Sequence, residues 1–399
     1  MVHNFYGSGA PSGENMVYAA ERELLRQHGH TVIEFTRHSD EIINRGSFGT
    51  IQGALATPWN PFSKRALRSV LEKEKPDVMH VHNIFPLLSP AIFHATKGLP
   101  TATVLTLHNY RTFCAAGIAM RDGAPCTECL DLRGVVPALK YGCYRKSRFS
   151  TLPLATMIAL HRRIKTWQTH VNSFVVLSDF QKERLAKAGL PAVRIHVKPP
   201  FYADPPDPLP WKERENKVVF VGRLGIEKGV YTLIEAWKLW GKEAPKLEVI
   251  GDGPEKVRLQ EAANGNGIGE RVFFLGGLPF PEVQRRLGQA CLLVLPSLCF
   301  EGFPLAITEA FSLGVPVVAS DVGPLPDIVK DGENGALFKA GDALSLYHTM
   351  KEIWGRSDRL SSLGQGARQE FEEKYTANTN HRALIRIYEA AVAHKRQCA

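Results

Sequence analysis

Short apolar runs alternate with amphipathic stretches along the first half of the chain. The apolar runs lie at residues 1–6, 31–35, 77–83, 101–109 and 172–178, and patterns with helical spacing lie between them at residues 13–29, 61–74 and 152–167. A short apolar run bounded by turn residues is typical of a buried strand, and apolar residues at every third or fourth position are typical of a helix. Their alternation predicts a parallel sheet covered by helices.

The second half repeats this alternation after a proline-dense interruption. Its strand-like runs lie at residues 217–224, 246–253, 271–277, 291–297 and 315–320, with helical segments between them. Proline stiffens the chain and removes backbone donors, so the run at 198–211 predicts a linker between domains. We expect two doubly wound α/β domains with a ligand in the cleft between their strand ends. A last helical pattern at 381–397 has an apolar stripe that must pack against another element.

Two glutamates, Glu301 and Glu309, lie around a predicted helix start. Pro304 suits the first turn of a helix and Gly314 is a stop signal, so we predict a helix that begins near Gly302. The helix lies between two strands, and in such βαβ units ligands bind at the carboxyl ends of strands, near the N–H groups of the helix. The alternative is that Glu301 only complements the helix dipole and that Glu309 is a solvated surface residue.

The composition narrows the class of protein. Of the 399 residues, 44% are hydrophobic and 22% are charged, which predicts two or three globular domains rather than disorder. No apolar run approaches the roughly eighteen residues of a membrane span. Met1 is followed by neither the basic region nor the long apolar region of a secretory signal. We therefore expect a cytoplasmic protein.

The net charge of +9 is unevenly distributed. No acidic residue occurs between Asp131 and Asp179, and aromatic and apolar residues are interleaved with the basic ones there. Such a surface suits anionic lipid headgroups or a phosphate-bearing lipid at the inner face of a membrane. Nucleic acid would attract the same charge, but no nucleic-acid-binding module is recognisable. A solvated basic face without a partner is the remaining alternative.

Two cations follow the strand-like run that opens the second half. Gly222 allows close approach of the backbone, Arg223 and Lys228 come next, and a helix is expected to start near Gly229. Together with the helix start near Gly302, these cations would suit a diphosphate, although either cation alone is more often mere surface charge. The chain has no D-x-D sequence to hold a divalent metal, so Arg223, Lys228 and backbone amides would have to neutralise the phosphate charge.

The stretches "GRLGIEKG", "GDGPE", "PSLCFEGFPLAITEA" and "GVPVVASDVGP" resemble the retaining family 4 glycosyltransferases, among them the bacterial surface-polysaccharide glycosyltransferases. This resemblance implies a GT-B fold, in which two Rossmann-like domains face each other across a cleft. It implies an acceptor-side domain at 1–198 with a Cys-rich basic insertion at about 111–165, a linker at 199–211, a nucleotide-sugar-binding domain at 212–375, and a final helix at 376–399 that packs back on the first domain. Relatives usually carry a few residues before the first strand, so Met1 is expected to be a late start.

The resemblance also implies roles for residues of the second domain. Arg223 and Lys228 match the pair that binds the donor diphosphate, Glu301 matches the glutamate that contacts the sugar hydroxyls, and Glu309 matches the ribose-binding glutamate. The other donor-binding positions implied in this domain are Gly222, Gly253, Pro254, Gly302, Phe303, Pro304 and Leu305. A carboxylate is a strong acceptor for vicinal hydroxyls, so both glutamate assignments are chemically sound.

In the first domain the resemblance implies fewer positions. The loop "GSGAPSGEN" matches a glycine loop near the acceptor and the diphosphate, with Gly13 as the position of close approach. In "TLHNY", His108 matches a histidine that faces the donor sugar, where a buried structural histidine would otherwise be the default. His80 and His82 are weaker candidates for this role. Asn109 stands where relatives often have an aspartate.

Four of the seven cysteines crowd one segment. Cys126 and Cys129 form C-x-x-C, a spacing that wraps zinc, and Cys114 and Cys143 are able to complete a site of four thiolates. Unligated thiols are the alternative, and disulfides are not expected in the cytoplasm. A zinc ion here would be structural and would shape the acceptor side. No catalytic metal is expected.

The predicted activity is transfer of a sugar from a nucleotide-diphosphate donor to a saccharide or polyprenyl-linked acceptor in polysaccharide biosynthesis. The resemblance implies retention of the anomeric configuration, and we predict same-face substitution in which the departing diphosphate oxygen accepts the proton of the acceptor. A GT-B sugar-nucleotide epimerase and a catalytically silent glycan-binding protein are the alternatives. The sequence leaves open the donor base and sugar, the acceptor and the oligomeric state.

Overall fold

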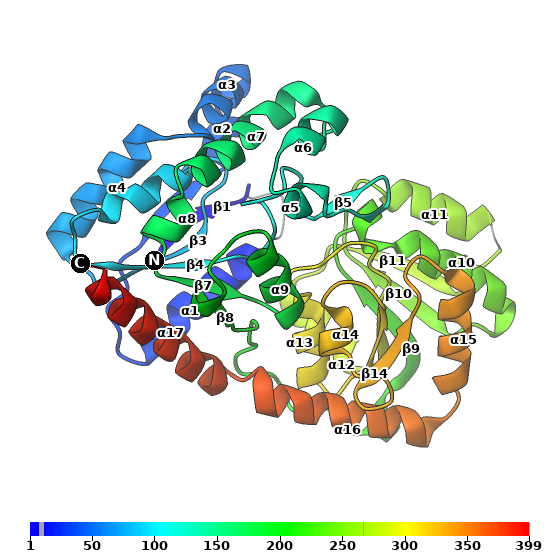
Figure 1. Cartoon of the computed structure of the whole chain (residues 1–399). Coiled ribbons are helices and arrows are strands. Elements are labelled where there is room, and N and C mark those ends of the chain that lie inside the picture. The colour runs from blue at the N-terminus through cyan, green and yellow to red at the C-terminus, as the bar shows by residue number, and fades with distance from the viewer. Residues whose placement is uncertain (8–11, 266, 399) are drawn as a thin grey trace. The chain divides into compact units, whose positions relative to one another are not determined.

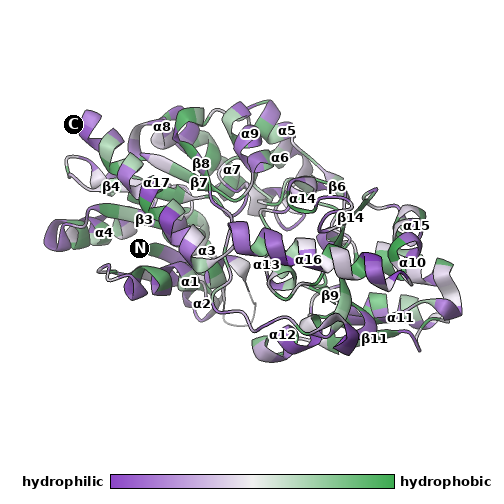
Figure 2. Ribbon diagram, turned by 90° about the horizontal axis from the view of Figure 1, so that it is seen from below, coloured by the Kyte–Doolittle hydropathy of each residue, from purple (hydrophilic) through white to green (hydrophobic). Residues whose placement is uncertain are grey.

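A computed structural model of the chain describes residues 1–7, 12–265 and 267–398, which form two units (Figure 1). Unit 1 comprises Met1–Ala119, Cys126–Pro199 and Asn380–Ala399, and unit 2 comprises Met120–Pro125 and Pro200–Thr379. Each unit is built around one parallel sheet. Figure 2 shows that the helices around the sheets carry both hydrophobic and hydrophilic residues, as the amphipathic patterns predict.

The sheet of unit 1 has the strand order β2-β1-β3-β4-β7-β8, and all of its pairings are parallel. Its strands are β1 (Val2–Phe5), β2 (Phe35–His38), β3 (Val78–Asn83), β4 (Ala102–Thr106), β7 (Ser173–Val176) and β8 (Ile195–Val197). The order of strands reverses between β1 and β3. In open α/β sheets, ligands bind outside the carboxyl ends of the strands at such a reversal.

The helices of unit 1 follow the predicted amphipathic stretches. They are α1 (Gly13–Gln27), α2 (Asp40–Ile43), α3 (Gly46–Ala56), α4 (Pro61–Glu74), α5 (Glu128–Asp131), α6 (Val136–Tyr141), α7 (Arg148–Arg163), α8 (Thr166–His170), α9 (Asp179–Lys187) and α17 (Ala377–Gln397). The predicted helices at 13–29 and 61–74 are confirmed by α1 and α4. The helix predicted at 152–167 begins earlier, because Ser147 caps α7 by accepting a hydrogen bond from the N–H of Ser150.

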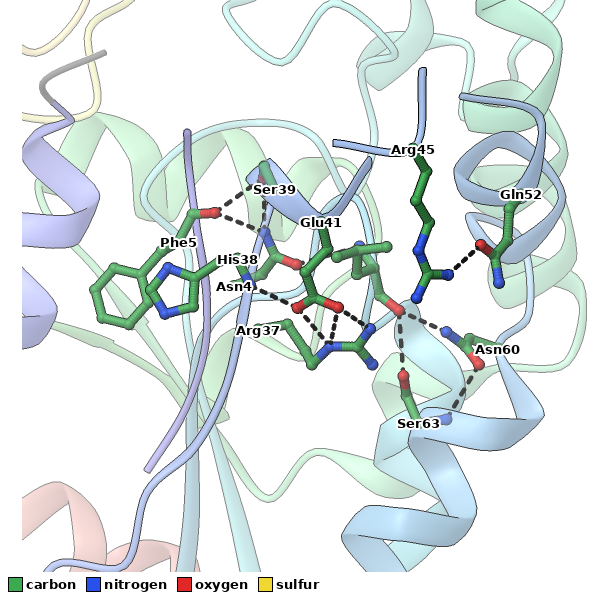
Figure 3. A network of polar contacts seen from close by, with 11 residues as sticks. Asn4, Phe5, Arg37, His38, Ser39, Glu41, Arg45, Gln52, Asn60 and Ser63 are labelled. Carbon is green, nitrogen blue, oxygen red and sulfur yellow. Dashed lines mark hydrogen bonds and ion pairs between the residues drawn. The ribbon is translucent and has the colours of Figure 1, made fainter. Parts of the chain in front are cut away.

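Side chains at the carboxyl ends of β1 and β2 hold the neighbouring helix starts in place (Figure 3). Asn4 donates to Ser39, which in turn donates to the carbonyl of Phe5. Asn60 caps α4 by accepting from the N–H groups of Phe62 and Ser63, and its amide donates to the carbonyl of Leu87. These bonds fix the loop that follows β3 against the start of α4.

The strand predicted at 31–35 is wrong in its position. β2 begins at Phe35, the residue that pairs with Val2 at the start of β1. Residues 31–34 form no ladder, since β1 offers partners only from Val2 onwards; the carbonyl of Ile33 instead accepts from the amino group of Met1. The apolar residues of this stretch belong to the segment that leads into β2 and not to a strand.

The apolar stripe of α17 packs on the sheet of unit 1. Ile387 and Ala391 form a buried cluster with Ala102, Val104 and Val175 of β4 and β7. The stripe of this final helix, which was expected to pack on the first domain, therefore lies on β4 and β7.

The sheet of unit 2 has the order β11-β10-β9-β12-β13-β14, again with parallel pairings throughout. Its strands are β9 (Glu215–Val221), β10 (Lys246–Ile250), β11 (Val272–Gly276), β12 (Ala290–Leu295), β13 (Val317–Ser320) and β14 (Gly335–Phe338). Its helices are α10 (Val230–Trp240), α11 (Lys256–Gly265), α12 (Phe280–Gly288), α13 (Leu305–Ser312), α14 (Leu325–Ile328), α15 (Ala343–Ile353) and α16 (Ser357–Lys374). The strand order reverses between β9 and β12, which is where this unit is expected to bind its ligand.

The helix after β12 starts later than predicted. α13 begins at Leu305, and its N-cap Pro304 has an extended conformation with ψ 114°. Pro304 therefore precedes the helix, and Gly302 and Phe303 belong to the loop. Among the described residues, the backbone N–H groups of Gly302, Phe303 and Leu305 have no acceptor, so this helix start offers a row of unpaired donors.

Candidate functional site

Lys228 and Glu301 meet at the carboxyl ends of the two strands where the order of unit 2 reverses. Lys228 follows β9 and Glu301 follows β12, and the Lys228 Nζ lies 2.7 Å from the Glu301 Oε1. The hydroxyl of Ser297 donates to the same carboxylate oxygen at 2.8 Å. The structure thus brings together a cation and a carboxylate that are 73 positions apart in the sequence.

Gly229 makes this close meeting of two loops sterically feasible. It has φ +64°, and a Cβ at this position would lie 1.8 Å from the carbonyl oxygen of Pro296. Beside it, the N–H of Leu298 donates to the carbonyl of Glu227 at 2.9 Å. Only glycine tolerates both the left-handed backbone and this contact, so Gly229 fixes the distance between the loops after β9 and β12.

The Lys228–Glu301 pair keeps the lysine charged. Burial disfavours the ammonium form of Lys228, but the charge and hydrogen bond of Glu301 outweigh it and raise the pKa of Lys228 above its usual range. The side chain of Lys228 is 24% exposed and that of Glu301 is 12% exposed, so both remain accessible from one side. A charged amine held at a strand end is suited to bind an anionic ligand.

Arg223 follows β9 as predicted and is exposed. No ion-pair partner for its guanidinium exists in the described part of the chain, which makes it available to a ligand. The loop that carries it is joined to the loop after β10, because the N–H of Leu224 donates to the carbonyl of Asp252 at 2.9 Å. A Cβ on Gly253 would lie 2.4 Å from the carbonyl oxygen of Leu224, so Gly253 permits this approach, and the exposed Pro254 follows it.

Glu309 is buried, so the alternative of a solvated surface glutamate is wrong. It is 8% exposed, and its carboxylate has no hydrogen-bond partner within the described ranges. Burial raises the pKa of Glu309 to about 7. A buried carboxyl without a partner is costly, and an incoming ligand with hydroxyl donors would satisfy it. Phe303, by contrast, packs its ring against Tyr375 and is held structurally.

In unit 1, His108 lies just beyond the end of β4 and is buried. Its Nε2 lies 3.2 Å from the Nδ1 of His82 at the end of β3. A small pocket beside it is lined by residues that include Asn83, Phe85 and Arg111. Burial lowers the pKa of His108 to about 3, although the charge of Glu21 opposes this shift, so the ring is neutral at neutral pH.

The predicted glycine loop of unit 1 falls partly on residues 8–11, which lie outside the described residues. Gly13 is the first residue of α1 and is exposed. Glu14 is next to it and accepts a hydrogen bond from the amide of Asn109 at 2.5 Å. Burial raises the pKa of Glu14. Asn109, which stands where relatives often have an aspartate, therefore positions a neighbouring carboxyl group.

Sequence reasoning missed a buried ion pair in unit 1 between Glu21 of α1 and Lys198, which follows β8. Glu21 and the buried His80 and His82 also bring their ligand atoms within 4.8 Å of one another. The available signal was the position of Glu21 in the apolar stripe of α1, between Tyr18 and Leu24. A carboxylate in such a stripe must have a charged or polar partner.

The four cysteines of the predicted zinc site lie in one region of unit 1. Burial raises the pKa of the Cys129 thiol to about 11, with further contributions from Cys114, Cys143 and Cys126. These four thiols are not among the groups of possible ligands that lie within 4.8 Å of one another in the described residues. They would have to move together to bind one ion.

Every helix in the described residues is too short or too polar to span a bilayer.

Family models match both units. The model described as "Glycosyltransferase Family 4" matches residues 13–202, and the model described as "Glycosyl transferases group 1" matches residues 204–370. The chain belongs to glycosyltransferase family 4. Together the two matches leave out only the ends of the chain and residue 203.

Curated relatives of this glycosyltransferase are mostly matched over part of their length. An exopolysaccharide phosphotransferase of Streptomyces coelicolor is 33% identical over 50% of this chain and 21% of its own length. An amylovoran biosynthesis glycosyltransferase of Erwinia amylovora is 27% identical over 53% of this chain and 55% of its own length. A 2-deoxystreptamine N-acetyl-D-glucosaminyltransferase of Streptomyces fradiae is 27% identical over 78% of this chain and 70% of its own length. The chain thus spans about half or less of the first two relatives.

The solved structures establish the fold of this glycosyltransferase. The crystal structure of HepE of Anabaena with UDP has a TM-score of 0.65 and 18% identity, over 97% of this chain and 99% of the other. The predicted GT-B fold, with its two Rossmann-like units, is confirmed by this match and by the two parallel sheets.

Proposed function

We propose that this protein transfers a sugar, with retention of configuration, from a nucleotide-diphosphate donor to a saccharide or lipid-linked acceptor in polysaccharide biosynthesis. The observation that carries the proposal is the meeting of Lys228 and Glu301 at the strand reversal of unit 2. Family membership, the exopolysaccharide and amylovoran relatives, and the UDP found in HepE all support it.

The donor diphosphate would take the place of Glu301 beside Lys228. Both phosphate and carboxylate are anions, and the amine of Lys228 already holds one. Arg223 and the unpaired N–H groups of Gly302 and Phe303 would supply the remaining donors. Glu301, released from Lys228, would then accept hydrogen bonds from the sugar hydroxyls. Glu309 would accept them from the ribose diol.

We propose that no divalent metal takes part in the reaction. Lys228 and Arg223 follow one strand and would carry the charge that develops on the departing diphosphate oxygen. That oxygen would accept the proton of the attacking hydroxyl, while the new bond forms on the face from which the diphosphate leaves.

A panel of nucleotide sugars tests the activity. The protein is incubated with each UDP-sugar and GDP-sugar, with and without a saccharide or polyprenyl-linked acceptor, in excess EDTA. We expect slow donor hydrolysis alone and faster transfer with the right acceptor, with the anomeric configuration of the donor in the product by NMR. Conversion of the donor to its epimer without acceptor, or activity that returns only on addition of Mg²⁺, would overturn the proposal.

We further propose that unit 1 binds the inner face of an anionic membrane. Phe48, Ile51 and Leu55 follow one another at helical spacing on α3 and are exposed, and α3 contacts α7. On α7, Phe149 is 90% exposed and Leu152 is also exposed. The basic residues that precede these apolar side chains, Arg145, Lys146 and Arg148, are exposed as well. Apolar and basic side chains together suit the headgroup region of anionic lipid.

Vesicle sedimentation tests this surface. We expect salt-sensitive binding to vesicles containing phosphatidylglycerol and little binding to vesicles of phosphatidylcholine alone. Phe149→Ser should weaken it, whereas Val193→Ser should not, because Val193 is equally exposed at 91% but lies on a different segment of unit 1. Equal binding of duplex DNA and of anionic vesicles would instead show that the basic residues bind phosphate groups in general.

We also propose a structural zinc ion at the four thiols.

A further inference from the structure

A line of buried polar groups runs through unit 1 from Lys198 to His108. Lys198 donates to one oxygen of Glu21, and the second oxygen of Glu21 lies 3.6 Å from the Nε2 of His82. The Nδ1 of His82 lies 3.2 Å from the Nε2 of His108. The side chains of Lys198, Glu21 and His82 are at most 2% exposed. The four groups come from α1, β3 and the segments after β4 and β8, so only the fold brings them together.

The charge at one end of this line is fixed. Burial alone would raise the pKa of Glu21, but the charge of Lys198 outweighs it and the pKa of Glu21 is lowered. The Glu21 carboxylate is therefore ionised at neutral pH and only accepts hydrogen bonds. Burial lowers the pKa of His82 well below its usual range and that of His108 to about 3, so both rings are neutral. A neutral imidazole has one donor nitrogen and one acceptor nitrogen.

The second oxygen of Glu21 and the Nε2 of His82 have no partner besides each other. Both atoms are fully buried, and neither is hydrogen-bonded within the described residues. Their separation of 3.6 Å is slightly longer than a hydrogen bond and closes with a small shift of either side chain. Buried polar atoms are nearly always paired, and two acceptor lone pairs facing each other would repel. The Nε2 of His82 must therefore carry a proton.

The proton on the Nε2 of His82 determines which of the other ring nitrogens are protonated. With its proton on Nε2, His82 presents an acceptor at Nδ1, so the Nε2 of His108 must donate to it. His108 then has its proton on Nε2 and a lone pair on Nδ1. No residue of the described chain is hydrogen-bonded to that Nδ1, and the ring borders the pocket after β4.

We propose that Glu21 and His82 are positioning residues that hold His108 in the tautomer protonated on Nε2, so that its Nδ1 accepts a hydrogen bond from a hydroxyl group of the ligand. The ligand part of this inference rests on the proposed function, and the tautomer does not. A hydroxyl can donate to this lone pair, whereas a carboxylate or a phosphate oxygen cannot. The arrangement thus favours an unmodified sugar over a uronic acid at this position.

A metal ion held by Glu21, His80 and His82 is the competing explanation of the same cluster. The distances between their ligand atoms would permit one. Lys198, however, already places an ammonium group on the Glu21 carboxylate, and this charge would repel a cation. His80 is hydrogen-bonded at both ring nitrogens, to Tyr388 and to Thr106. The geometry therefore points to a hydrogen-bonded line rather than a metal centre.

Nitrogen NMR of the ligand-free protein tests the proposal. Protein labelled with ¹⁵N-histidine is measured at neutral pH, and the His108 signals are assigned by their loss in His108→Gln. We expect the proton of His108 on Nε2 in the wild type. In Glu21→Gln the amide oxygen stays on Lys198 and the amide N–H₂ faces His82. The Nε2 of His82 then accepts a hydrogen bond, and its Nδ1 donates to the Nε2 of His108. The proton of His108 therefore moves to Nδ1. His161 is the internal control, because its Nε2 lies 2.9 Å from the carbonyl of Pro58 and keeps its proton in both proteins.

The outcomes separate this proposal from the proposed function. A wild-type His108 protonated on Nδ1 overturns the proposal even if Glu21→Gln fails to fold, and so does a Glu21→Gln spectrum in which His108 is unchanged. Neither result bears on sugar transfer. Donor hydrolysis gives a second readout. His82→Ala should slow it at least tenfold when it is introduced into the wild-type protein, and should have no further effect when it is added to His108→Ala. Equal effects of His82→Ala in both backgrounds would mean that His82 does not act through His108.

Discussion

The candidate sites of the two units hold their charged groups in different ways. In unit 1 the ion pair of Glu21 and Lys198 is fully buried, and a line of neutral histidines leads from it to the pocket. In unit 2 the pair of Lys228 and Glu301 is partly exposed at a strand end. A buried pair fixes positions and protonation states, whereas an exposed pair can open for a ligand. We infer that the buried pair of unit 1 fixes the positions of the site residues, and that the exposed pair of unit 2 separates when a ligand binds.

The largest expected difference in the free energy of unfolding is between substitutions of two buried lysines, Lys198 and Lys217. Lys198→Met should lower the free energy of unfolding of unit 1 by about 3–5 kcal/mol, because it leaves the carboxylate of Glu21 buried and uncompensated. Lys217→Met is the matched change in unit 2, where Glu248 keeps Lys246 at 2.8 Å and Arg286 at 3.2 Å. Its cost should be only about 1 kcal/mol. Urea unfolding measures both, and equal costs would contradict the comparison.

Removal of the exposed cation should act on turnover instead. Lys228→Ala should reduce kcat by about 100- to 1000-fold with little change in stability, since it removes a group that stabilises the departing diphosphate. Arg223→Ala should reduce it by about 10-fold or more for the same reason. Lys238→Ala is the control, because Lys238 is an exposed lysine on α10 that pairs only with the nearby Glu235 in the described structure. Steady-state rates near the wild-type value for Lys228→Ala would refute the role of the pair.

Glu301→Gln should have a smaller effect. The amide keeps one acceptor oxygen but loses the charge, so about 1.5–3 kcal/mol of transition-state binding should be lost, or about 10- to 200-fold in kcat/KM. The loss should disappear for a donor analogue that lacks the sugar hydroxyl bound by Glu301. A loss of the same size with every deoxy-sugar donor would assign Glu301 to holding Lys228 alone.

Glu309 should give unit 2 an unusual dependence of stability on pH. Its pKa of about 7 lies above the ordinary value of 4.5, so between these values the folded protein keeps a proton that the unfolded chain has released. Stability from this group is therefore full below pH 4.5, falls as the pH rises to about 7, and is level above. Glu309→Gln should remove this fall and be more stable by about 1–3 kcal/mol above pH 7. Parallel curves for the two proteins would show that Glu309 is already ionised.

The smallest expected effect concerns metal content. If the four thiols bind a structural zinc, the purified protein should contain about one equivalent, and Cys129→Ser should lose it while Cys398→Ser, at the exposed end of the chain, should not. Emission spectrometry of the three proteins decides this. Less than about a tenth of an equivalent in the wild type would remove the zinc proposal.

Much of unit 2 was predictable because its site residues follow one another along the sequence. Arg223, Lys228, Glu301 and Glu309 lie in two short motifs, and the pattern placed each motif after a strand. What the sequence did not predict was the burial of Glu309 and the position of Pro304 before the helix, since both depend on how the loop after β12 packs.

The polar line of unit 1 was less predictable. Glu21 and Lys198 are 177 positions apart, and no local pattern relates them. Only the topology of the sheet brings the end of β8 to α1, so a glutamate in the apolar stripe of α1 was the single sequence signal for this pair. The strands β8 and β14 were also missed: β8 has a histidine between its two apolar residues, and β14 opens on a glycine, so neither forms a continuous apolar run.

A crystal structure of the protein with a bound nucleotide-diphosphate sugar would test the donor site directly. We expect diphosphate oxygens within about 3 Å of the Lys228 amine, with Glu301 turned from Lys228 to the sugar hydroxyls and Glu309 on the ribose diol. A diphosphate bound elsewhere, with the contact between Lys228 and Glu301 intact, would contradict it.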